Sequence, residues 1–366
     1  MKKIAFLMRY DYLEKGGGDV IQIKNYIPHL ELHGYQCELL DDLNLYNVYD
    51  FDIFILVNID RPVETINYFR FLKKNSPNKK VFLIPIHHPI DAINKFEKEK
   101  KGVLFRFFSI VLPDFYSREK FKNFVRVFRY PKMIPLAFQH VFINYRSVIK
   151  KLILSVDGIV FISDGERKSI EKDFRCAPQS FCISYNAVEM DFPVESLTPK
   201  VTDIIIVGRI EPRKNQLNVA KILASMDITA IFIGPKNNNN NYYFDAFTNI
   251  INTSSNIDYL GPMEHSKVLE YLKRSRILLN ASYFEVNPLV DLEAALVGCG
   301  VVTTKYSYSI ESLPNVIEID PWLDDSIIDG LNKALESPKN TILNKNINSS
   351  WRASVEPILE LIQKCS

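Results

Sequence analysis

The chain has 366 residues, which is more than one hydrophobic core usually covers, so two domains are expected. Its hydrophobic content of 47%, charged content of 24% and net charge of +2 are typical of a soluble globular protein and indicate no class of partner. The five cysteines lack CxxC or Cys/His spacing, which argues against a zinc site or disulfide framework and favours a reducing cytoplasm. No stretch approaches the roughly 20 apolar residues of a membrane span.

The first half of the chain alternates between strand and helix patterns. Short apolar runs predict buried strands at 3–8, 51–59, 79–89 and 156–163, and helical spacing predicts helices at 16–34, 62–75 and 164–174. The second half restarts the pattern with a strand, loop and helix over 203–226. It continues with strands at 228–235, 257–261, 276–282 and 300–304 and with helices at 265–275 and 288–298.

Repeated strand–helix units with continuously apolar strands predict parallel sheets. Two such series predict an α/β fold of two Rossmann-like, doubly wound domains facing a cleft. The Pro-rich stretch 190–202 separates the series, so we expect an N-terminal domain over 1–195 and a C-terminal domain over 196–345. A final helix within 346–366 is expected to pack back toward the first domain.

Ligands of such sheets bind at the carboxyl ends of the strands, so the residues after each strand are the candidates for a site. Gly17 and Gly18 follow the first strand at a predicted helix start, where glycines let backbone amides approach an anion. The spacing is neither GxGxxG nor a Walker motif, and the alternative is a flexible surface turn.

The sequence VGRIEPRKNQ follows a predicted strand of the second half. It places Arg209 directly after the strand and Lys214 just before the next helix. Two cations at the top of a sheet suit a diphosphate, because arginine supplies a fork of donors and lysine a point charge. The alternative is a solvated basic loop in which Glu211 neutralises the charge.

The stretch YFEVNPLVDLEAAL, residues 283–296, contains a predicted helix start. Asn287 is a suitable N-cap and Pro288 a suitable first helical residue. The backbone N–H groups of Leu289 and Val290 would then be available to an anion such as a phosphate.

Two carboxylates, Glu285 and Glu293, stand on either side of that helix start. They would repel a phosphate, so they suit hydroxyl groups around it: sugar hydroxyls near Glu285 and ribose hydroxyls near Glu293. Carboxylates and a diphosphate site together predict a nucleotide-sugar as the ligand. The alternative places Glu293 on a solvated helix face, which its apolar neighbours disfavour.

These motifs resemble the group 1 glycosyltransferases, glycosyltransferase family 4, over roughly residues 156 to 304. The resemblance implies a retaining enzyme of the GT-B architecture, with two Rossmann-like domains. It implies that Arg209 and Lys214 contact the donor diphosphate. It further implies that Glu285 contacts the transferred sugar and Glu293 the nucleotide ribose.

The same resemblance implies that Leu289 and Val290 supply phosphate-binding amides. A histidine after an N-domain strand, His87 or His88, would reach the donor sugar. One departure is clear, because the family usually has Gly-Phe-Gly after the first glutamate and this chain has Val-Asn-Pro at 286–288. Asn-Pro can still cap the helix, so phosphate binding is retained, while the identity of the donor sugar transfers less well.

The hypothesis for the mechanism is transfer with retention by same-face substitution, because no N-domain carboxylate presents itself as a nucleophile. The leaving diphosphate would take the acceptor's proton while Arg209 and Lys214 stabilise its charge. Glu285 and His88 complete the expected catalytic set. No cofactor and no essential metal are expected, because the DxD-like pair at 50–52 lies at the start of a strand, the wrong end for ligands.

Residues 95–151 differ from the rest, with fourteen Lys and Arg against four Asp and Glu and with ten of the 24 phenylalanines. A cationic segment rich in aromatic rings suits an anionic membrane surface. The alternative is a helical insert whose rings pack inward, and nucleic acid is disfavoured because no nucleic-acid motif accompanies the segment. The candidates for membrane contact are Phe105, Arg106, Phe107, Phe108, Lys122 and Arg126.

The resulting hypothesis is a cytoplasmic enzyme, peripheral on the inner face of the cytoplasmic membrane. It would move a sugar from a UDP- or GDP-linked donor to a saccharide or lipid-linked saccharide in bacterial O-antigen, capsule or lipopolysaccharide synthesis. The alternative is a catalytically silent nucleotide-sugar-binding or scaffold subunit. A Rossmann oxidoreductase is disfavoured, because the chain lacks both GxGxxG and the acidic residue about 20 positions further on.

Overall fold

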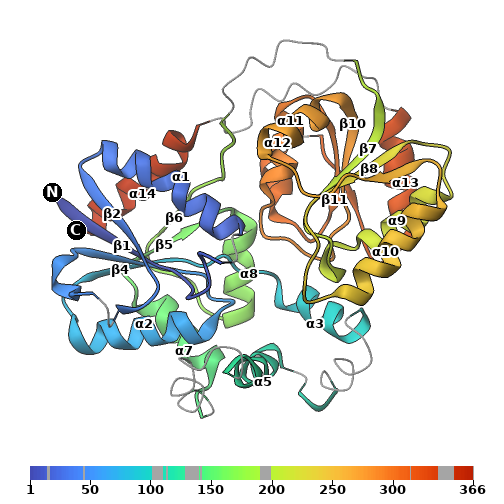
Figure 1. The fold of residues 1–366 in the computed structure, drawn as a ribbon. Coiled ribbons are helices and arrows are strands. Elements are labelled where there is room, and N and C mark those ends of the chain that lie inside the picture. The colour runs from blue at the N-terminus through green and yellow to red at the C-terminus, as the bar shows by residue number, and fades with distance from the viewer. Residues whose placement is uncertain are drawn as a thin grey trace. The chain divides into compact units, whose positions relative to one another are not determined.

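The computed structural model describes residues 1–14, 17–43, 46–100, 110–112, 114–127, 140, 142–189, 199–313, 315–336 and 350–365, without the side chains of 123–127. The chain folds into two compact units (Figure 1). Unit 1 comprises Met1–Asn186 with Ser350–Ser366, and unit 2 comprises Ala187–Ser349. The division follows Asn186, whereas the sequence placed the boundary after residue 195.

Unit 1 is built on a parallel six-stranded sheet in the order β2-β1-β3-β4-β5-β6. Its strands are β1 (Lys2–Leu7), β2 (Tyr35–Leu40), β3 (Ile53–Val57), β4 (Lys80–Ile84), β5 (Gly158–Phe161) and β6 (Phe181–Ile183). Its helices are α1 (Gly18–Leu32), α2 (Pro62–Asn75), α3 (Ile90–Glu99), α5 (Phe115–Val127), α7 (Tyr145–Ser155), α8 (Asp164–Phe174) and α14 (Trp351–Cys365), with the 3-10 turn η2 (Val48–Asp50).

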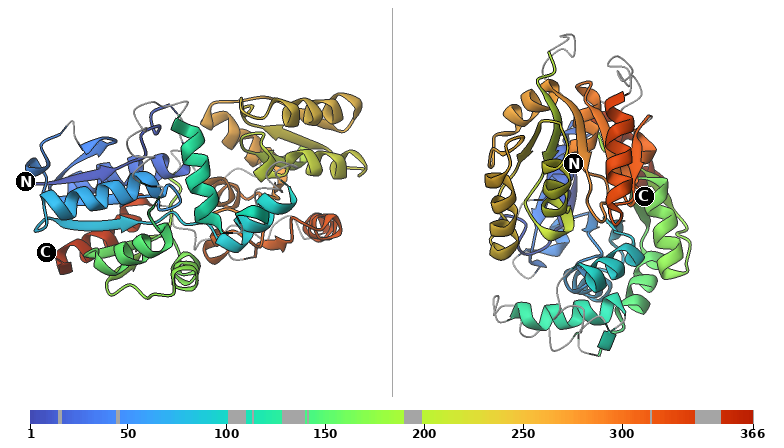
Figure 2. Two further views of the ribbon diagram at one scale, coloured as in Figure 1. Left: turned by 90° about the horizontal axis from the view of Figure 1, so that it is seen from below. Right: turned by 90° about the vertical axis from the view of Figure 1, so that its right-hand side faces the viewer.

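The C-terminal helix α14 belongs to unit 1, as Figures 1 and 2 show. It packs along α1, where the buried rings of Trp351 and Tyr26 meet edge to face with centroids 5.7 Å apart. Ser184, which follows β6, donates from its Oγ to the carbonyl of Ser354 on α14 at 2.7 Å. The last helix of the chain therefore closes one face of the first sheet.

Unit 2 is built on a parallel six-stranded sheet in the order β12-β11-β10-β7-β8-β9. Its strands are β7 (Thr202–Val207), β8 (Ala230–Ile233), β9 (Ile257–Tyr259), β10 (Ser275–Asn280), β11 (Gly300–Thr304) and β12 (Ile317–Ile319). Its helices are α9 (Gln216–Ala224), α10 (Asn241–Thr253), α11 (His265–Arg274), α12 (Leu289–Leu296) and α13 (Asp324–Glu336), with the 3-10 turns η4 (Pro212–Lys214) and η5 (Tyr308–Ser312). The predicted α/β class, with two doubly wound parallel sheets, is confirmed.

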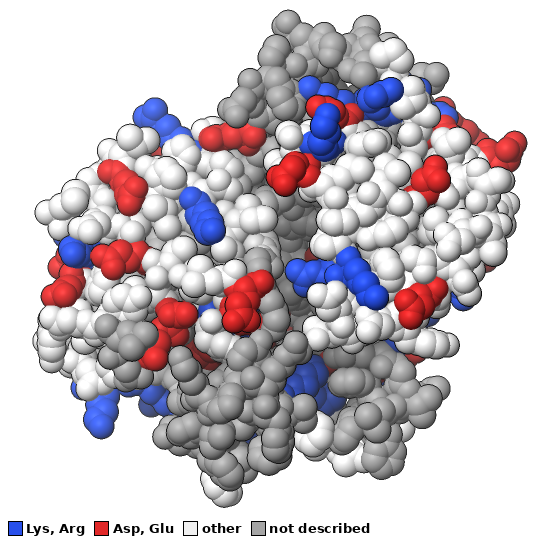
Figure 3. All heavy atoms as spheres, in the orientation of Figure 1, with Lys and Arg blue, Asp and Glu red and all other residues white. Residues whose placement is uncertain are grey.

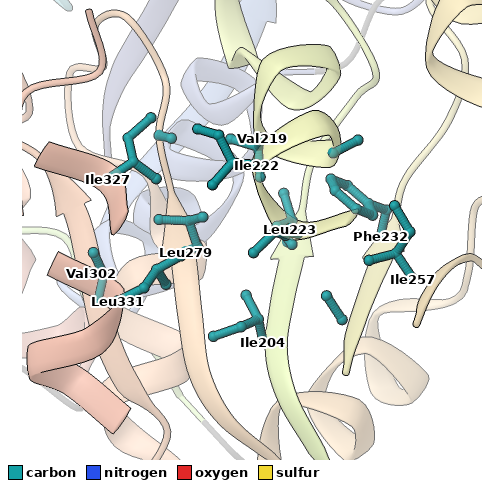
Figure 4. Close-up of a cluster of buried hydrophobic side chains, with 14 of the residues drawn as sticks. Ile204, Val219, Ile222, Leu223, Phe232, Ile257, Leu279, Val302, Ile327 and Leu331 are labelled. Atoms are coloured by element: carbon teal, nitrogen blue, oxygen red, sulfur yellow. The ribbon is translucent and has the colours of Figure 1, made fainter. Parts of the chain in front are cut away.

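The apolar side chains of the second sheet alternate between its two faces, as strand geometry requires. Ile204 and Ile206 of β7 belong to a cluster with side chains of α9, α10 and α13, whereas Ile205 belongs to a cluster with α11 and α12. Figure 4 shows the first cluster, in which Leu223 of α9 and Ile327 of α13 meet the sheet. Helices on both faces explain why these strands are apolar along their whole length.

The strand order of the second sheet reverses between β10 and β7, which are paired neighbours. In the first sheet the corresponding point lies between β1 and β3. Ligands of open α/β sheets bind outside the carboxyl ends of the strands at such a switch point. The loops that follow β7 and β10, and those that follow β1 and β3, are therefore the places to search for a site.

Gly234, which follows β8, supports the loop after β7 by a close backbone approach. Its φ is +147°, and a Cβ at this position would lie 2.1 Å from the carbonyl oxygen of Gly208. We expect Gly234→Ala to lower the free energy of unfolding of unit 2 by about 3 kcal/mol or more, because the added methyl overlaps backbone that cannot yield. Urea unfolding followed by circular dichroism measures the loss.

The matched control is Gly261→Ala. Gly261 lies in the loop after β9. Gly261 also has a positive φ, +74°, but a Cβ there would meet nothing within 4 Å. This variant carries only the left-handed backbone strain of about 1–2 kcal/mol. Equal losses in the two variants would show that the contact with Gly208 contributes nothing beyond strain.

Candidate functional site

The loop between β7 and α9 carries three cationic side chains. Arg209 is exposed directly after Gly208, and Arg213 and Lys214 lie in η4. The Lys214 side chain lies over Gly208, with its Cε 3.6 Å from the position that a Cβ would take. The amide of Gln216 on α9 donates to the carbonyl of Arg209 at 2.8 Å and holds the loop against the helix.

Glu285, in the loop after β10, joins two of these cations. Its Oε1 accepts a hydrogen bond from Nζ of Lys214 at 2.5 Å and lies 3.0 Å from Nη1 of Arg213. The same Nη1 donates to the carbonyl of Phe284 at 3.0 Å. The backbone N–H of Glu285 donates to the carbonyl of Tyr306, after β11, at 3.0 Å. The carboxylate of Glu285 therefore joins the loops after β7 and β10, and its backbone N–H adds the loop after β11.

The Glu285 carboxylate is buried and ionised. Only 7% of the residue is exposed. Burial opposes its ionisation, but Arg213 and Lys214 outweigh that effect and hold the pKa of Glu285 well below its usual range. An ionised carboxylate can only accept hydrogen bonds, so further partners of Glu285 must be donors such as sugar hydroxyls.

The structure brings together Lys214 and Glu285, which the sequence selected separately. Arg213 is a functional candidate that sequence reasoning missed, although it directly precedes Lys214. Its role became visible only through contact with Glu285 and Phe284. Arg209 is exposed, and no described ion pair joins it to Glu285, so its contact with the donor diphosphate stays a prediction.

Helix α12 begins one residue later than the sequence suggested. Its N-cap is Pro288, which has extended backbone (φ −68°, ψ 120°), and no side chain caps the helix. The prediction that Asn287 caps α12 is therefore wrong, because the chain is still extended at the following residue. Leu289 and Val290 are the first two helical residues, which leaves their N–H groups at the open end of the helix.

Asp291, in the first turn of α12, is completely buried among neutral donors. Its Oδ1 accepts from Asn280 at the end of β10 at 2.9 Å, and its Oδ2 accepts from Thr303 of β11 at 2.8 Å and from Ser309 of η5 at 3.0 Å. These bonds attach the start of α12 to the carboxyl ends of β10 and β11. Burial nevertheless raises the pKa of Asp291 to about 6. Sequence reasoning did not select this residue.

Glu293 faces His265, the first residue of α11, rather than bulk solvent. Its Oε1 lies 2.8 Å from Nε2 of His265, and its side chain is 12% exposed against 64% for the imidazole. This hydrogen bond raises the pKa of His265. The alternative of a fully solvated Glu293 is not supported, and a ribose hydroxyl would share the carboxylate with His265.

Gly17 and Gly18 begin α1, with Gly17 at the N-cap position. The carboxylate of Asp19 occupies the same helix end, where its Oδ1 accepts from the N–H of Val20 at 3.0 Å and lies 2.7 Å from where a Cβ of Gly17 would be. Arg9 donates from Nε to Asp19 at 3.0 Å. Anion binding by the two glycines is not supported, because a carboxylate of the chain itself already lies at this helix end.

The two histidines lie beyond β4, which ends at Ile84. His87 is completely buried, with Nδ1 2.8 Å from Asp60 and Nε2 2.9 Å from Asp173. The prediction that His87 contacts a substrate is therefore not supported, because both ring nitrogens are engaged inside unit 1. The His88 side chain is 26% exposed, and its Nδ1 lies 2.8 Å from Asp60. His88 stays the candidate from this unit.

The predicted membrane contacts are only partly described. Phe105, Arg106, Phe107, Phe108 and the side chain of Arg126 lie outside the described residues. Lys122 on α5 is ion-paired, with its Nζ 2.6 Å from both Glu97 and Glu119, and its contact with a membrane stays a prediction. Phe115 is also buried, which matches the inward-packing alternative for this part of the segment. Four apolar side chains nearby are exposed, namely Ile110, Val111, Phe121 and Phe142.

Two further observations bear on membrane and metal binding. Across the described parts of the chain, no helix is both long and apolar enough to span a bilayer. The described His, Cys, Asp and Glu side chains form no group that could hold a metal ion. Asp52 accepts the N–H of Lys3 at the amino end of β3, opposite to the ligand edge of the sheet.

Comparison with known proteins shows which family the second unit is similar to. Residues 189–350, which include Lys214, Glu285 and Glu293, match the family model described as glycosyl transferases group 1. The resemblance to group 1 glycosyltransferases is confirmed. The GPI3 subunit of phosphatidylinositol N-acetylglucosaminyltransferase from Saccharomyces cerevisiae (strain YJM789) is 25% identical over 215 residues, covering 54% of this chain. The chain spans about half that relative's length, 46%.

Three solved structures share the fold over nearly the whole chain. Sucrose-phosphate synthase from Thermosynechococcus elongatus has a TM-score of 0.70 at 11% identity, covering 100% of this chain and 99% of that one. Anabaena HepE in complex with UDP-glucose has a TM-score of 0.63 at 14% identity (100% and 98%). The lipopolysaccharide outer core galactosyltransferase WaaB has a TM-score of 0.62 at 17% identity (99% and 99%). The predicted GT-B fold is confirmed.

Asp291 makes the stability of unit 2 depend on pH. Its folded-state pKa of about 6 lies above the usual value of 3.8, so its stabilising contribution is complete below about pH 4 and is lost as pH rises through 6. Asp291→Asn removes this titration and lets Thr303 and Ser309 accept instead of donate. We expect the variant to gain roughly 3 kcal/mol over the wild type between pH 4 and pH 8, measured by urea unfolding.

The matched control for this comparison is Asp258→Asn, which changes an exposed carboxylate of β9 in the same unit. Its stability should follow that of the wild type at each pH. Parallel curves for Asp291→Asn and the wild type would contradict a raised pKa at Asp291.

Proposed function

We propose that this protein is a retaining glycosyltransferase that transfers a sugar from a nucleotide-diphospho-sugar to a saccharide or lipid-linked saccharide. The observation that carries the proposal is the contact of Lys214 and Arg213 with buried Glu285 at the switch point of the second sheet. It lies within the residues that match the group 1 glycosyltransferase family. Hydroxyl acceptors and cations in one cluster suit a sugar joined to a diphosphate.

We assign each part of the donor to the protein group whose chemistry suits it. The diphosphate is placed at the N–H groups of Leu289 and Val290, where the positive end of α12 favours an anion. Lys214 adds a positive charge to the diphosphate site. Its side chain is 16% exposed beside Glu285 and so can also contact a ligand. Glu285 accepts from the hydroxyls of the transferred sugar, and Glu293 accepts from those of the ribose.

Bond breaking in this proposal leaves negative charge on the diphosphate. The bond from the anomeric carbon to the donor phosphate oxygen breaks, and the acceptor oxygen forms its bond on the same face. The acceptor's proton passes to the leaving phosphate oxygen. Lys214 and Arg209 stabilise the developing charge without a metal, which is the form of catalysis that positioned cations provide.

The acceptor is proposed to be lipid-linked or part of a lipopolysaccharide, in bacterial surface polysaccharide assembly. The names of two similar proteins support this choice, one a transferase to phosphatidylinositol and the other a lipopolysaccharide galactosyltransferase. The exposed side chains of Ile110, Val111, Phe121 and Phe142 supply apolar contact with a bilayer. On the face drawn in Figure 3, acidic and basic side chains are interspersed. Peripheral binding to the inner face of the cytoplasmic membrane is therefore assigned to the segment 95–151.

A second candidate is a nucleotide-sugar-binding subunit without activity of its own. Val-Asn-Pro at 286–288 favours it, because the backbone beside Glu285 lacks the flexible glycines of the family. The curated relative is itself named as a subunit. Transfer or hydrolysis of any UDP- or GDP-sugar by the isolated protein distinguishes the enzyme from this alternative. A thermal-shift screen against the same panel identifies the donor, with UDP-sugars first because HepE was solved with UDP-glucose.

Lys214→Ala and Glu285→Ala should each lower kcat/KM for the donor by about 10²-fold or more, because each removes a proposed contact with the donor and also leaves its charged partner without this ion pair. The double variant should lose much less than the product of the two single losses, since both act through the same pair. Steady-state kinetics with the donor found by thermal shift provide the measurement.

The control is Lys221→Ala, which removes an exposed lysine of α9 in the same unit. It should retain the wild-type kcat/KM. Near-normal rates in both Lys214→Ala and Glu285→Ala, with folding verified by circular dichroism, would refute the proposed site.

Membrane binding has its own test. The protein should co-sediment with vesicles containing phosphatidylglycerol, and the bound fraction should fall between 50 and about 500 mM salt because charge attraction is screened. The variant Ile110→Ser/Val111→Ser/Phe142→Ser should bind several-fold more weakly, since it loses the apolar contact. Neutral phosphatidylcholine vesicles serve as the control. Absence of binding to anionic vesicles would remove the membrane from the proposal.

A further inference from the structure

Two helices that begin beside the carboxyl ends of the second sheet's strands are joined there by a polar pair. Helix α11 follows β9 and helix α12 follows β10, and the two helices pack side by side (Figure 1). Nε2 of His265, the first residue of α11, lies 2.8 Å from Oε1 of Glu293 on α12. Both residues belong to unit 2, and the pair lies on the side of its sheet where ligands of such folds bind.

Apolar packing between the two helices sets the positions from which His265 and Glu293 meet. His265 stands on the same face of α11 as three apolar side chains that lie one and two turns further on. That face and α12 share one buried cluster, which includes Val268, Leu269, Leu272, Leu292 and Ala295. The cluster fixes the distance between the helices, so the backbone positions of His265 and Glu293 do not depend on the pair itself.

The hydrogen bond of this pair runs from His265 to Glu293. A carboxylate can only accept hydrogen bonds, so Nε2 of the imidazole carries the proton that lies between them. This hydrogen bond, together with the attraction of the carboxylate charge, raises the pKa of His265 although burial opposes the shift. Oε1 of Glu293 is therefore engaged by the protein itself.

The other oxygen of this carboxylate, Oε2, accepts no hydrogen bond from the described residues. Helical side chains lean toward the N-terminus of their helix, so the Glu293 carboxylate lies back toward the open end of α12. Glu293 follows Leu289, the first residue of α12, by four positions, which is about 6 Å along the helix axis. A nucleoside diphosphate spans a gap of this size between its phosphate and its ribose hydroxyls.

A purely structural role explains less of this arrangement. The imidazole is 64% exposed, and a pair exposed to water contributes little stability because its charges are screened. The buried cluster already holds α11 against α12. What the hydrogen bond adds is a single orientation of the Glu293 carboxylate near the start of α12.

We propose that His265 is a positioning residue for nucleotide binding, which holds Oε1 of Glu293 and leaves Oε2 to accept from the ribose hydroxyls. The inference deepens the proposed function and rests on it, because the contact of Glu293 with the ribose belongs to that proposal. Without His265 the carboxylate turns about its side-chain torsions, so it loses most of its preference for a nucleotide that carries both hydroxyls.

The test compares nucleotides with and without ribose hydroxyls. Isothermal titration calorimetry gives the dissociation constants of UDP and GDP, and then that of the 2′,3′-dideoxy form of the tighter binder. The wild-type protein should bind the dideoxy form about 10²-fold more weakly, because each hydrogen bond to a charged group contributes roughly tenfold or more. His265→Ala should reduce this ratio to about tenfold or less, and it should change the affinity for the dideoxy form less than about threefold.

Two further variants separate positioning from a general effect of changing α11. His265→Gln places an amide nitrogen near the position of Nε2 and should restore the wild-type ratio. Lys267→Ala removes the exposed ion pair of Lys267 with Glu270, 2.9 Å apart on the same helix, and should leave the ratio unchanged. The positioning role is overturned if His265→Gln behaves like His265→Ala, or if Lys267→Ala lowers the ratio as much.

A second measurement uses only the wild-type protein and so does not depend on the folding of a variant. The ring ¹⁵N resonances of His265, assigned sequence-specifically, report its tautomer at a pH where the ring is neutral. A protonated Nε2 supports the proposal, and an unprotonated Nε2 overturns it.

Nucleotide binding by the wild-type protein separates this inference from the proposed function. If the wild type binds neither UDP nor GDP and transfers no sugar, the proposed function fails and the inference fails with it. If the wild type binds a nucleotide but does not distinguish the dideoxy form, the positioning role alone is overturned. The same holds if His265→Ala keeps the wild-type ratio or weakens the binding of both nucleotides equally.

Discussion

The contact of Glu285 with Lys214 and Arg213 is the interaction on which the rest of the site depends. The carboxylate is buried after β10, and both cations belong to the loop after β7, so one acid joins two loops at the switch point of the sheet. Separating them would leave a charge in a desolvated place, so the loops are held together. The open end of α12 follows Glu285 closely in the chain, which places backbone amides near the same cluster.

Unit 1 also contains a largely buried carboxylate that neighbouring side chains hold in place. Asp60 is fixed by two histidines from the next strand's loop, and Asp291 in unit 2 is fixed by donors from β10, β11 and η5. In each case a buried carboxylate lies beside the carboxyl ends of parallel strands. Burying each carboxylate costs free energy, and its hydrogen bonds form in only one geometry. Each carboxylate therefore fixes the arrangement of the polar groups around it at some cost in stability.

Local patterns predicted most elements and several site residues, because strand and helix periodicities are properties of neighbouring residues. Lys214, Glu285 and Glu293 were selected because they follow strands or flank a helix start. The errors came where distant contacts override local preference. Asn287 suits a cap, but the chain stays extended through Pro288, so the helix begins one residue later. His87 follows a strand, yet its ring lies between Asp60 of the loop after β3 and Asp173 of α8.

The sequence by itself determined two series of strand–helix units, the apolar faces that cover each sheet, and the family resemblance of the second half. Those features depend on the spacing of residues along the chain. Only the tertiary structure decided which charges meet: Arg213 joins Glu285, His265 joins Glu293, and Asp60 joins His88. The reason is that a hydrogen bond requires atoms about 3 Å apart, and folding brings such atoms together from strands far apart in sequence.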